Sequence, residues 1–311
     1  MLPFAPSLLV RPLASDEWEA AGAAVNRLLL SAPYSAAMEE AALHEQLFGE
    51  SPSTVWPTRW TRRQLLGAWR AGELVGVLDA AAGSDSENLL LGDMQPIGLL
   101  RCLVLPERKD LVNPAANALL AAAAAFWRGC GVGFVKAYHV STGYPTMQAG
   151  AGLLPGEWSD QVRLLTEDGF RFADRYYLLV RPLEMMLEEN VPQGGLSLAF
   201  RGPVSDRRYQ VFFRRTELIA EARLLQRPAQ TGTDVQPFGY IAQWNVDERW
   251  RNQKLGRWLL RRMINDATQQ GVKELAVHLQ PQQAAAMNLL AQHGFIELNY
   301  RGYSFEKELA E

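Results

Sequence analysis

The chain repeats one order of predicted elements, and this repetition constrains its fold more than any other feature. Apolar alternation predicts strands, and apolar positions spaced by three and four residues predict helices. The predicted order is a hairpin, a strand, a long helix, a strand, a shorter helix and a final strand. In the first copy these elements cover, in that order, residues 63–81, 96–105, 113–131, 133–140, 157–168 and 169–183. In the second copy they cover residues 207–227, 238–246, 254–271, 272–280, 281–294 and 295–309. A Gly-Phe pair follows the shorter helix in both copies, at Gly169 and Phe170 and at Gly294 and Phe295. The sequence therefore predicts an internal duplication.

The two copies predict two tandem domains of the α+β class, each with a mixed, largely antiparallel central sheet flanked by helices. We expect the first domain at residues 1–183 and the second at residues 196–311. Residues 184–195, "EMMLEENVPQGG", carry acids, a proline and glycines, a composition that suits a linker. The first copy also begins with a strand at 7–13, which residues 194–202 match in the second copy, and with helices at 15–30 and 36–49, and the second copy has little room for these two helices.

Charge and hydropathy argue against two classes of partner. The net charge of −3 gives no general case for binding nucleic acid or a membrane surface, and the basic cluster "RWTRRQ" at 59–64 is short. The longest apolar run, residues 118–127, falls well short of the roughly 20 residues of a membrane-spanning helix. The first residues lack a basic region ahead of an apolar core, so we expect no signal peptide.

The metal-ligating residue types are few and scattered. Two cysteines, Cys102 and Cys130, are too few for a disulfide framework or a cysteine-based zinc site, and they suit the reducing cytoplasm. The four histidines show no ligand-like spacing. The sequence thus predicts a cytoplasmic protein without a metal site.

Residues 248–260, "ERWRNQKLGRWLL", place many hydrogen-bond donors and one glycine at the start of a predicted helix. A helix N-terminus offers unpaired backbone N–H groups and the positive end of its dipole, so it binds phosphate readily. Gly256 would let the backbone approach a ligand closely. The alternative is a helix start with a solvated basic face and no ligand.

This segment and its flanks resemble the GNAT superfamily of N-acyltransferases. The family's loop reads Val-x-Pro-x-x-Arg-x-x-Gly-x-Gly/Ala before a Leu-Leu helix, and the later strand, helix and Gly-Phe pair follow in the family's order. Here the register has Glu248 in place of Pro and Lys254 in place of the first Gly. The matching positions are Val246, Arg251, Gly256, Leu259 and Leu260. The resemblance covers residues 207–309 and, more loosely, residues 7–311 as a tandem pair.

The resemblance implies that acetyl-CoA binds to the second copy as a co-substrate. The backbone of residues 252–257 would hold its pyrophosphate, and Arg251 and Lys254 would add positive charge. The exposed backbone of residues 244–246 would pair with the amide groups of pantetheine. The expected cofactor-binding residues are Trp244, Asn245, Val246, Arg251, Asn252, Gln253, Lys254, Leu255, Gly256 and Arg257.

Catalytic groups are harder to assign. Many members of the family protonate the leaving thiolate with a Tyr on the last helix, but that position is Leu290 here. Some use a carboxylate on the strand before the loop as base, and residues 236–246 contain none. The remaining candidates are His278, Tyr240, Glu221 and Tyr300. Each has an alternative role as a packed or hydrogen-bonded structural residue.

The first copy departs further from the family pattern. Residues 104–120 keep Val104 and Pro106 but contain no glycine, and the helix is predicted to start at Asn113 and Pro114. We expect this copy not to bind the cofactor productively, and instead to form a wall of the substrate site or to support the second domain. The glycine-rich residues 141–156 suggest either a mobile loop near a ligand or an unconstrained connection.

The resulting prediction is an acetyl-CoA-dependent N-acetyltransferase that acts on a small amine by direct attack on the thioester, as a monomer or homodimer. Two alternatives remain open. One is a non-catalytic CoA-binding or scaffold protein that keeps the fold, and the other is an enzyme that transfers a different acyl group.

Overall fold

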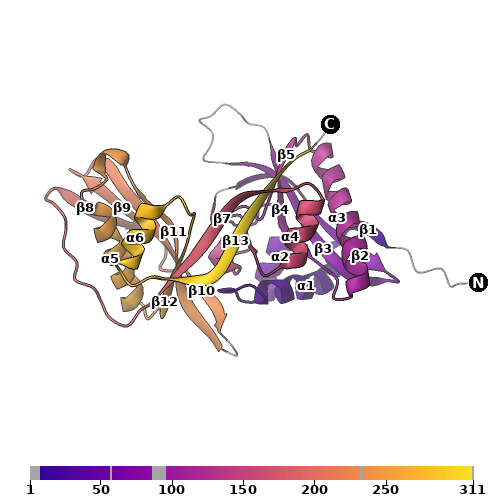
Figure 1. The fold of residues 1–311 in the computed structure, drawn as a ribbon, viewed down its shortest axis with the longest axis horizontal. Coiled ribbons are helices and arrows are strands. Elements are labelled where there is room, and N and C mark those ends of the chain that lie inside the picture. Colours follow the sequence, from indigo (N-terminus) through magenta and orange to yellow (C-terminus); the bar gives the residue numbers. More distant parts are fainter. Residues whose placement is uncertain (1–7, 57, 86–95, 232–233, 310–311) are drawn as a thin grey trace, which may run out of the picture. The chain divides into compact units, whose positions relative to one another are not determined.

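The structure is a computed structural model that describes residues 8–56, 58–85, 96–231 and 234–309. The chain divides into two compact units, and Figure 1 shows the elements of each. Unit 1 comprises Met1–Arg175 with Gly302–Glu311, and unit 2 comprises Tyr176–Arg301. We expected domains at 1–183 and 196–311 with a linker at 184–195, whereas this division places residues 176–195 in unit 2 and residues 302–311 in unit 1. Two strands, β7 and β13, each contribute residues to both units.

Secondary structure follows the predicted order. The elements up to the unit boundary are β1 (Leu9–Pro12), α1 (Trp18–Leu30), α2 (Glu40–Phe48), β2 (Thr58–Arg70), β3 (Glu73–Asp85), β4 (Ile97–Val104), α3 (Lys109–Gly129), β5 (Phe134–Ala137), β6 (Leu154–Pro155), α4 (Ser159–Glu167) and β7 (Arg171–Pro182). The later elements are β8 (Leu196–Arg201), β9 (Asp206–Phe213), β10 (Glu217–Thr231), β11 (Asp234–Val246), α5 (Leu255–Gln269), β12 (Glu274–Leu279), α6 (Ala284–Ala291) and β13 (Ile296–Glu308).

Each unit is built on a largely antiparallel sheet, as predicted. In unit 1 the strands run in the order β1-β2-β3-β4-β5-β13, and in unit 2 the order is β7-β12-β11-β10-β9-β8. The parallel pairs are β4 with β5 and β11 with β12. Helices α1 and α3 pack on the sheet of unit 1, and α5 packs on β10 and β11 of unit 2. The chain therefore has the α+β class with sheet-flanking helices that the sequence predicts.

The internal duplication extends to the backbone details of β4 and β11. Each parallel ladder includes a glycine, where Gly98 pairs with Val135 and Gly239 pairs with Leu275. A Cβ at Gly239 would lie 2.4 Å from Leu275 Cδ2, so a larger residue here would have to displace the Leu275 side chain. Three residues later each strand has a bulge, at Arg101 in β4 and at Ala242 in β11.

Two predictions for the first copy were wrong. Helix α3 begins at Lys109, and Pro114 lies inside it rather than at its start. Proline was interpreted as a first-turn residue, but this helix accommodates it and forgoes one backbone hydrogen bond. The glycine-rich residues 141–156 are not an unconstrained connection, because most of them are buried, with Tyr144 and Ala149 at 0% exposure.

In the described part of the chain, no helix combines the length and apolar character needed to cross a membrane.

Candidate functional site

The parallel pairing of β11 with β12 is short, and the strands separate beyond it. Gly239 pairs with Leu275 and Tyr240 pairs with Ala276, and no later pair joins these two strands among the residues that the structure describes. On its other side β11 stays paired with β10 as far as Val246. One backbone edge of residues 241–246 is thus left without a strand partner. Such an edge can pair with the amide groups of an extended ligand.

The connection from β11 to α5 turns sharply through two residues with positive φ. Asn252 has φ 63° and Lys254 has φ 64°. Lys254 is the N-cap of α5, and its carbonyl accepts the first helical hydrogen bond from the N–H of Trp258 at 3.0 Å. The N–H groups of residues 255–257 therefore precede the helical ladder, and the N-cap side chain does not bond to them. This geometry provides donors for an anion at the positive end of the α5 dipole.

Positive charge surrounds these N–H groups. The side chains of residues 251–254 are exposed, and so is that of Arg257, which donates to Gln292 Oε1 at 2.9 Å. Arg251 donates to the Val246 carbonyl at 3.3 Å and lies 3.8 Å from Glu248. Both groups are largely exposed, so this ion pair holds Arg251 only weakly. The predicted phosphate-binding residues thus lie together at one helix start.

Gly256 is not required by packing within the chain. A Cβ built there would lie 3.6 Å from Trp244 Cζ2 and 3.7 Å from Val246 Cγ2, which is ordinary van der Waals contact. Trp244 and Val246 direct their side chains to the core beneath α5. Their expected role toward a ligand therefore belongs to the backbone.

Replacing Lys254 with Gly is expected to raise the free energy of unfolding by about 0.5–1 kcal/mol, because a lysine pays a steric cost at positive φ that glycine avoids. The greater freedom of glycine in the unfolded chain offsets part of this gain. Urea unfolding of Lys254→Gly and Lys254→Ala measures the effect. Alanine keeps the Cβ, so an equal gain in Lys254→Ala would assign the effect to charge and contradict the backbone explanation.

Tyr240 and His278 lie together on the sheet face opposite α5. The Tyr240 hydroxyl and His278 Nδ1 are 3.1 Å apart, and the His278 ring centroid is 5.9 Å from that of Tyr300. Burial lowers the pKa of His278 to about 3 and raises that of Tyr240. His278 is therefore neutral at pH 7, which makes it a weak general base. Its Nε2 atom is buried and has no hydrogen-bond partner among the described residues.

The pH dependence of stability tests this assignment of His278. Its pKa is about 3 in the folded protein against a usual 6.5, so the unfolded chain binds the extra proton between these values. The stabilisation is complete above pH 6.5 and declines as the pH falls toward 3. We expect the wild type to lose about 2 kcal/mol more than His278→Gln between pH 7 and pH 5. Equal losses in urea unfolding would contradict a buried, neutral His278.

Glu221 lies apart from this pair, on β10. Its Oε1 accepts a hydrogen bond of 2.6 Å from the Gln243 side chain, and its backbone pairs with Asn245. Gln243 follows the bulge at Ala242, which returns it to the face opposite α5. Sequence reasoning missed Gln243, because only the bulge reveals that its amide can hold Glu221. The third predicted catalytic candidate is thus half-buried and fixed by a neighbouring strand.

The position at which many family members carry the tyrosine acid holds a core leucine here. Leu290 is fully buried in the core of unit 2 with Leu259 and Phe295. No group of three or more His, Cys, Asp or Glu side chains is placed to hold a metal ion in the described ranges.

The equivalent position in unit 1 is filled by the protein's own side chains. At the bulge of β4, the Arg101 guanidinium lies 3.2 Å from Asp79 and donates to Gln46 and to the Thr142 carbonyl. The N–H of Leu103 donates to the Tyr138 hydroxyl at 3.1 Å. Residues 105–108 make a shorter connection than residues 247–254 and contain no positive φ. A charged Arg101 inside the apolar run "GLLRCLVL" was the sequence signal for this filling.

Comparison with known proteins finds one family model that matches part of the chain and several solved structures with a similar fold. Residues 175–295 match the model of the acetyltransferase (GNAT) family. No curated protein sequence matches the chain. Similar solved structures include a tandem GNAT protein from the clavulanic acid biosynthesis pathway, with 15% identity and a TM-score of 0.68 over 98% of this chain and 99% of that one.

Two further structures share the fold. A GCN5-related N-acetyltransferase from Sphaerobacter thermophilus is 11% identical, with a TM-score of 0.59 over 98% of this chain and 96% of that chain. The glucosamine N-acetyltransferase region of a fungal multi-domain β-N-acetylglucosaminidase is 12% identical, with a TM-score of 0.66 over 97% of this chain and 38% of that chain.

Proposed function

Because residues 175–295 match the GNAT family model and the fold is similar to that of tandem GNAT proteins, we propose that the chain is an acetyl-CoA-dependent N-acetyltransferase whose cofactor site lies in unit 2. The observation that carries the proposal is the continuity of two features. The unpaired edge of residues 241–246 leads directly to the donor-rich start of α5. A pantetheine arm on the first and a pyrophosphate on the second would account for both.

In the proposed reaction, the nitrogen of a neutral amine attacks the thioester carbon and the C–S bond breaks. The amine gives up a proton and the CoA thiolate takes one up. Glu221, oriented by Gln243, is the candidate proton acceptor, acting through water. His278 and Tyr240 are candidate hydrogen-bonding groups that orient a reactant. Positioning of the two substrates supplies the larger part of the rate.

Turnover with a panel of amines tests this proposal. We propose a small amine as acceptor, and glucosamine belongs in the panel because one structural relative is a glucosamine N-acetyltransferase region. Release of free CoA thiol that depends on the amine, with an acetylated product of the expected mass, would support the proposal. CoA binding without turnover of any amine would favour the non-catalytic alternative, which the apolar Leu290 motivates.

The acyl group is tested separately. Acetyl-CoA, propionyl-CoA and octanoyl-CoA would compete for the same loop, so their relative rates of turnover show which acyl chain length the enzyme prefers. We expect acetyl-CoA to react fastest. If a longer acyl-CoA reacts faster, the group that the enzyme transfers is that longer acyl group and not acetyl.

A further inference from the structure

Each unit takes the end of its last strand from the other copy of the repeat. In unit 2, residues 177–182 of β7 pair with β12, although β7 is the final strand of the first copy. In unit 1, residues 305–308 of β13, drawn in yellow in Figure 1, pair with β5, although β13 is the final strand of the second copy. Residues 302–309 thus contact unit 1, although in sequence they follow the residues of unit 2.

The backbone of residues 302–309 continues the sheet of unit 1. Residues 302 and 303 pair with β6, and residues 305–308 pair with β5. Beyond the strand, the N–H of Leu309 donates to the Gly133 carbonyl at 2.9 Å. Sheets bind extended peptides through the same kind of backbone ladder, which supplies affinity.

Two side chains fix the register of this segment. Phe305 is 0% exposed in the core of unit 1, and its ring centroid lies 4.6 Å from that of Phe172. Lys307 Nζ lies 2.6 Å from Asp168 Oδ2 and 5.3 Å from the centre of the Phe170 ring. A slip of one residue would move both side chains to the other face of the sheet, so the site selects this sequence in this register.

We propose that residues 302–309 are an exchangeable strand, and that their site in unit 1 accepts the same segment from a second molecule of this chain. The contacts of the backbone, Phe305 and Lys307 all join the segment to residues 133–172, so they form equally well when the segment comes from another molecule. The partner is an extended peptide with phenylalanine at the position of Phe305 and lysine two residues later. Exchange requires that the tethered segment first leave the site, because its effective concentration there is on the order of millimolar.

Cutting the full chain tests the proposal. A protease recognition sequence is inserted between Arg301 and Gly302, at the boundary of the two units, and the purified protein is cut there. We expect the fragment that begins at Gly302 to stay bound during size-exclusion chromatography at about 10 µM, and a labelled peptide of residues 302–309 to replace it. Separation of the fragment from a chain that stays folded, without binding of the peptide, would overturn the proposal. A fragment that stays bound but is not replaced by excess peptide would contradict exchange.

Matched peptides identify the contacts. Phe305→Ala in the peptide should weaken binding by roughly a hundredfold or more, because it removes a buried ring. Lys307→Ala should weaken binding by roughly fivefold, since its ion pair is partly exposed. Glu308→Gln is the control and should leave binding unchanged, because Glu308 is exposed. Equal binding of all four peptides would contradict the proposal.

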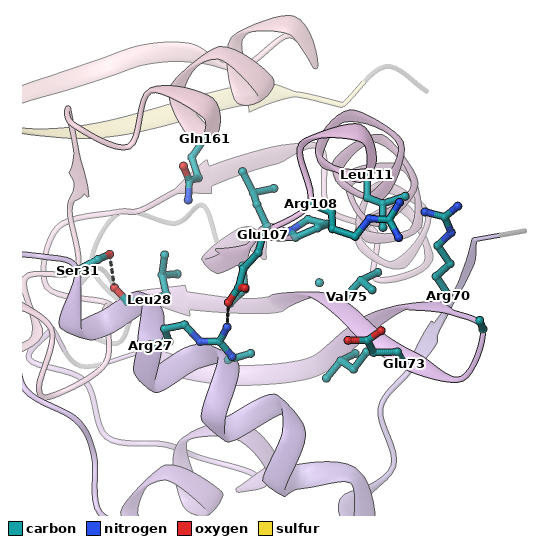
Figure 2. Close-up of a pocket in the computed structure, with 17 residues that line it drawn as sticks. Arg27, Leu28, Ser31, Arg70, Glu73, Val75, Glu107, Arg108, Leu111 and Gln161 are labelled. Atoms are coloured by element: carbon teal, nitrogen blue, oxygen red, sulfur yellow. Dashed lines mark hydrogen bonds and ion pairs between the residues drawn. The ribbon is translucent and has the colours of Figure 1, made fainter. Parts of the chain in front are cut away.

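A cavity of unit 1 provides a control for location. It has a volume of about 570 Å³ and lies between α1, the turn of the β2–β3 hairpin and the connection from β4 to α3 (Figure 2). Arg27 and Glu107 line this cavity and pair with each other (Figure 2). Arg27→Gln should leave peptide binding unchanged, and weaker binding would place the peptide in this cavity instead.

If the insertion prevents folding, the uncut full chain with Phe305→Asp takes its place. The segment of this variant would have to bury a charged side chain, so it should leave the site open to the wild-type peptide. We expect the variant to bind the peptide at least about tenfold more tightly than the uncut wild type, whose own segment competes. Equal binding by the two proteins, or no binding by the folded variant, would overturn the proposal.

Discussion

Replacing Gly256 with Trp is expected to weaken the affinity for CoA by roughly a hundredfold or more and to abolish acetyl transfer. The indole would cover the N–H groups at the start of α5 and remove at least two charge-assisted hydrogen bonds to the pyrophosphate. Calorimetry measures the affinity, and thiol release measures the rate. An unchanged affinity in a folded variant would place the cofactor elsewhere.

Gly256→Ala is the matched control for this result. Its Cβ makes only ordinary contacts with Trp244 and Val246, and alanine favours a helix more than glycine. We therefore expect the thermal stability of Gly256→Ala to equal or exceed that of the wild type. Its CoA affinity should fall less than that of Gly256→Trp, because a methyl group leaves most of the N–H groups accessible.

Replacing Asp79 with Ala is expected to lower the free energy of unfolding by about 3–5 kcal/mol, since it leaves a buried guanidinium without its carboxylate. The Arg101 side chain has 0% exposure, and Asp79 also accepts from the Tyr144 hydroxyl at 2.7 Å. Urea unfolding measures the loss. The surface pair of Arg163 and Glu167 provides the control, and Glu167→Ala should cost no more than about 1 kcal/mol.

A loss of less than 1 kcal/mol in Asp79→Ala would mean that water reaches Arg101. It would contradict the interpretation that unit 1 has filled its own site with a buried ionic cluster.

The repeated order of elements was predictable because hairpins, helices and strands follow from local periodicity. The hairpin over residues 63–81 and the start of α5 next to Gly256 were both located from sequence. The assignment of residues 302–311 to unit 1 was not predictable, because strand partners are chosen by tertiary pairing. The sequence pattern of β13 predicts a strand, but it does not indicate which strands β13 pairs with.

The part of the candidate site in which backbone groups would contact the ligand was predictable from sequence. The part that depends on side chains was less predictable. The loop of residues 251–257 follows from glycine, charge and a helix start. His278 illustrates the limit, since its residue type suggests a base and only its burial shows that its pKa falls to about 3. Glu221 and Gln243 come together through a bulge that no residue type indicates.

The stoichiometry of CoA binding to the full chain tests the central claim most directly. The account predicts one molecule per chain by calorimetric titration, and loss of that binding in Gly256→Trp. No binding, two molecules per chain, or binding that survives in Gly256→Trp would contradict a single cofactor site at the start of α5.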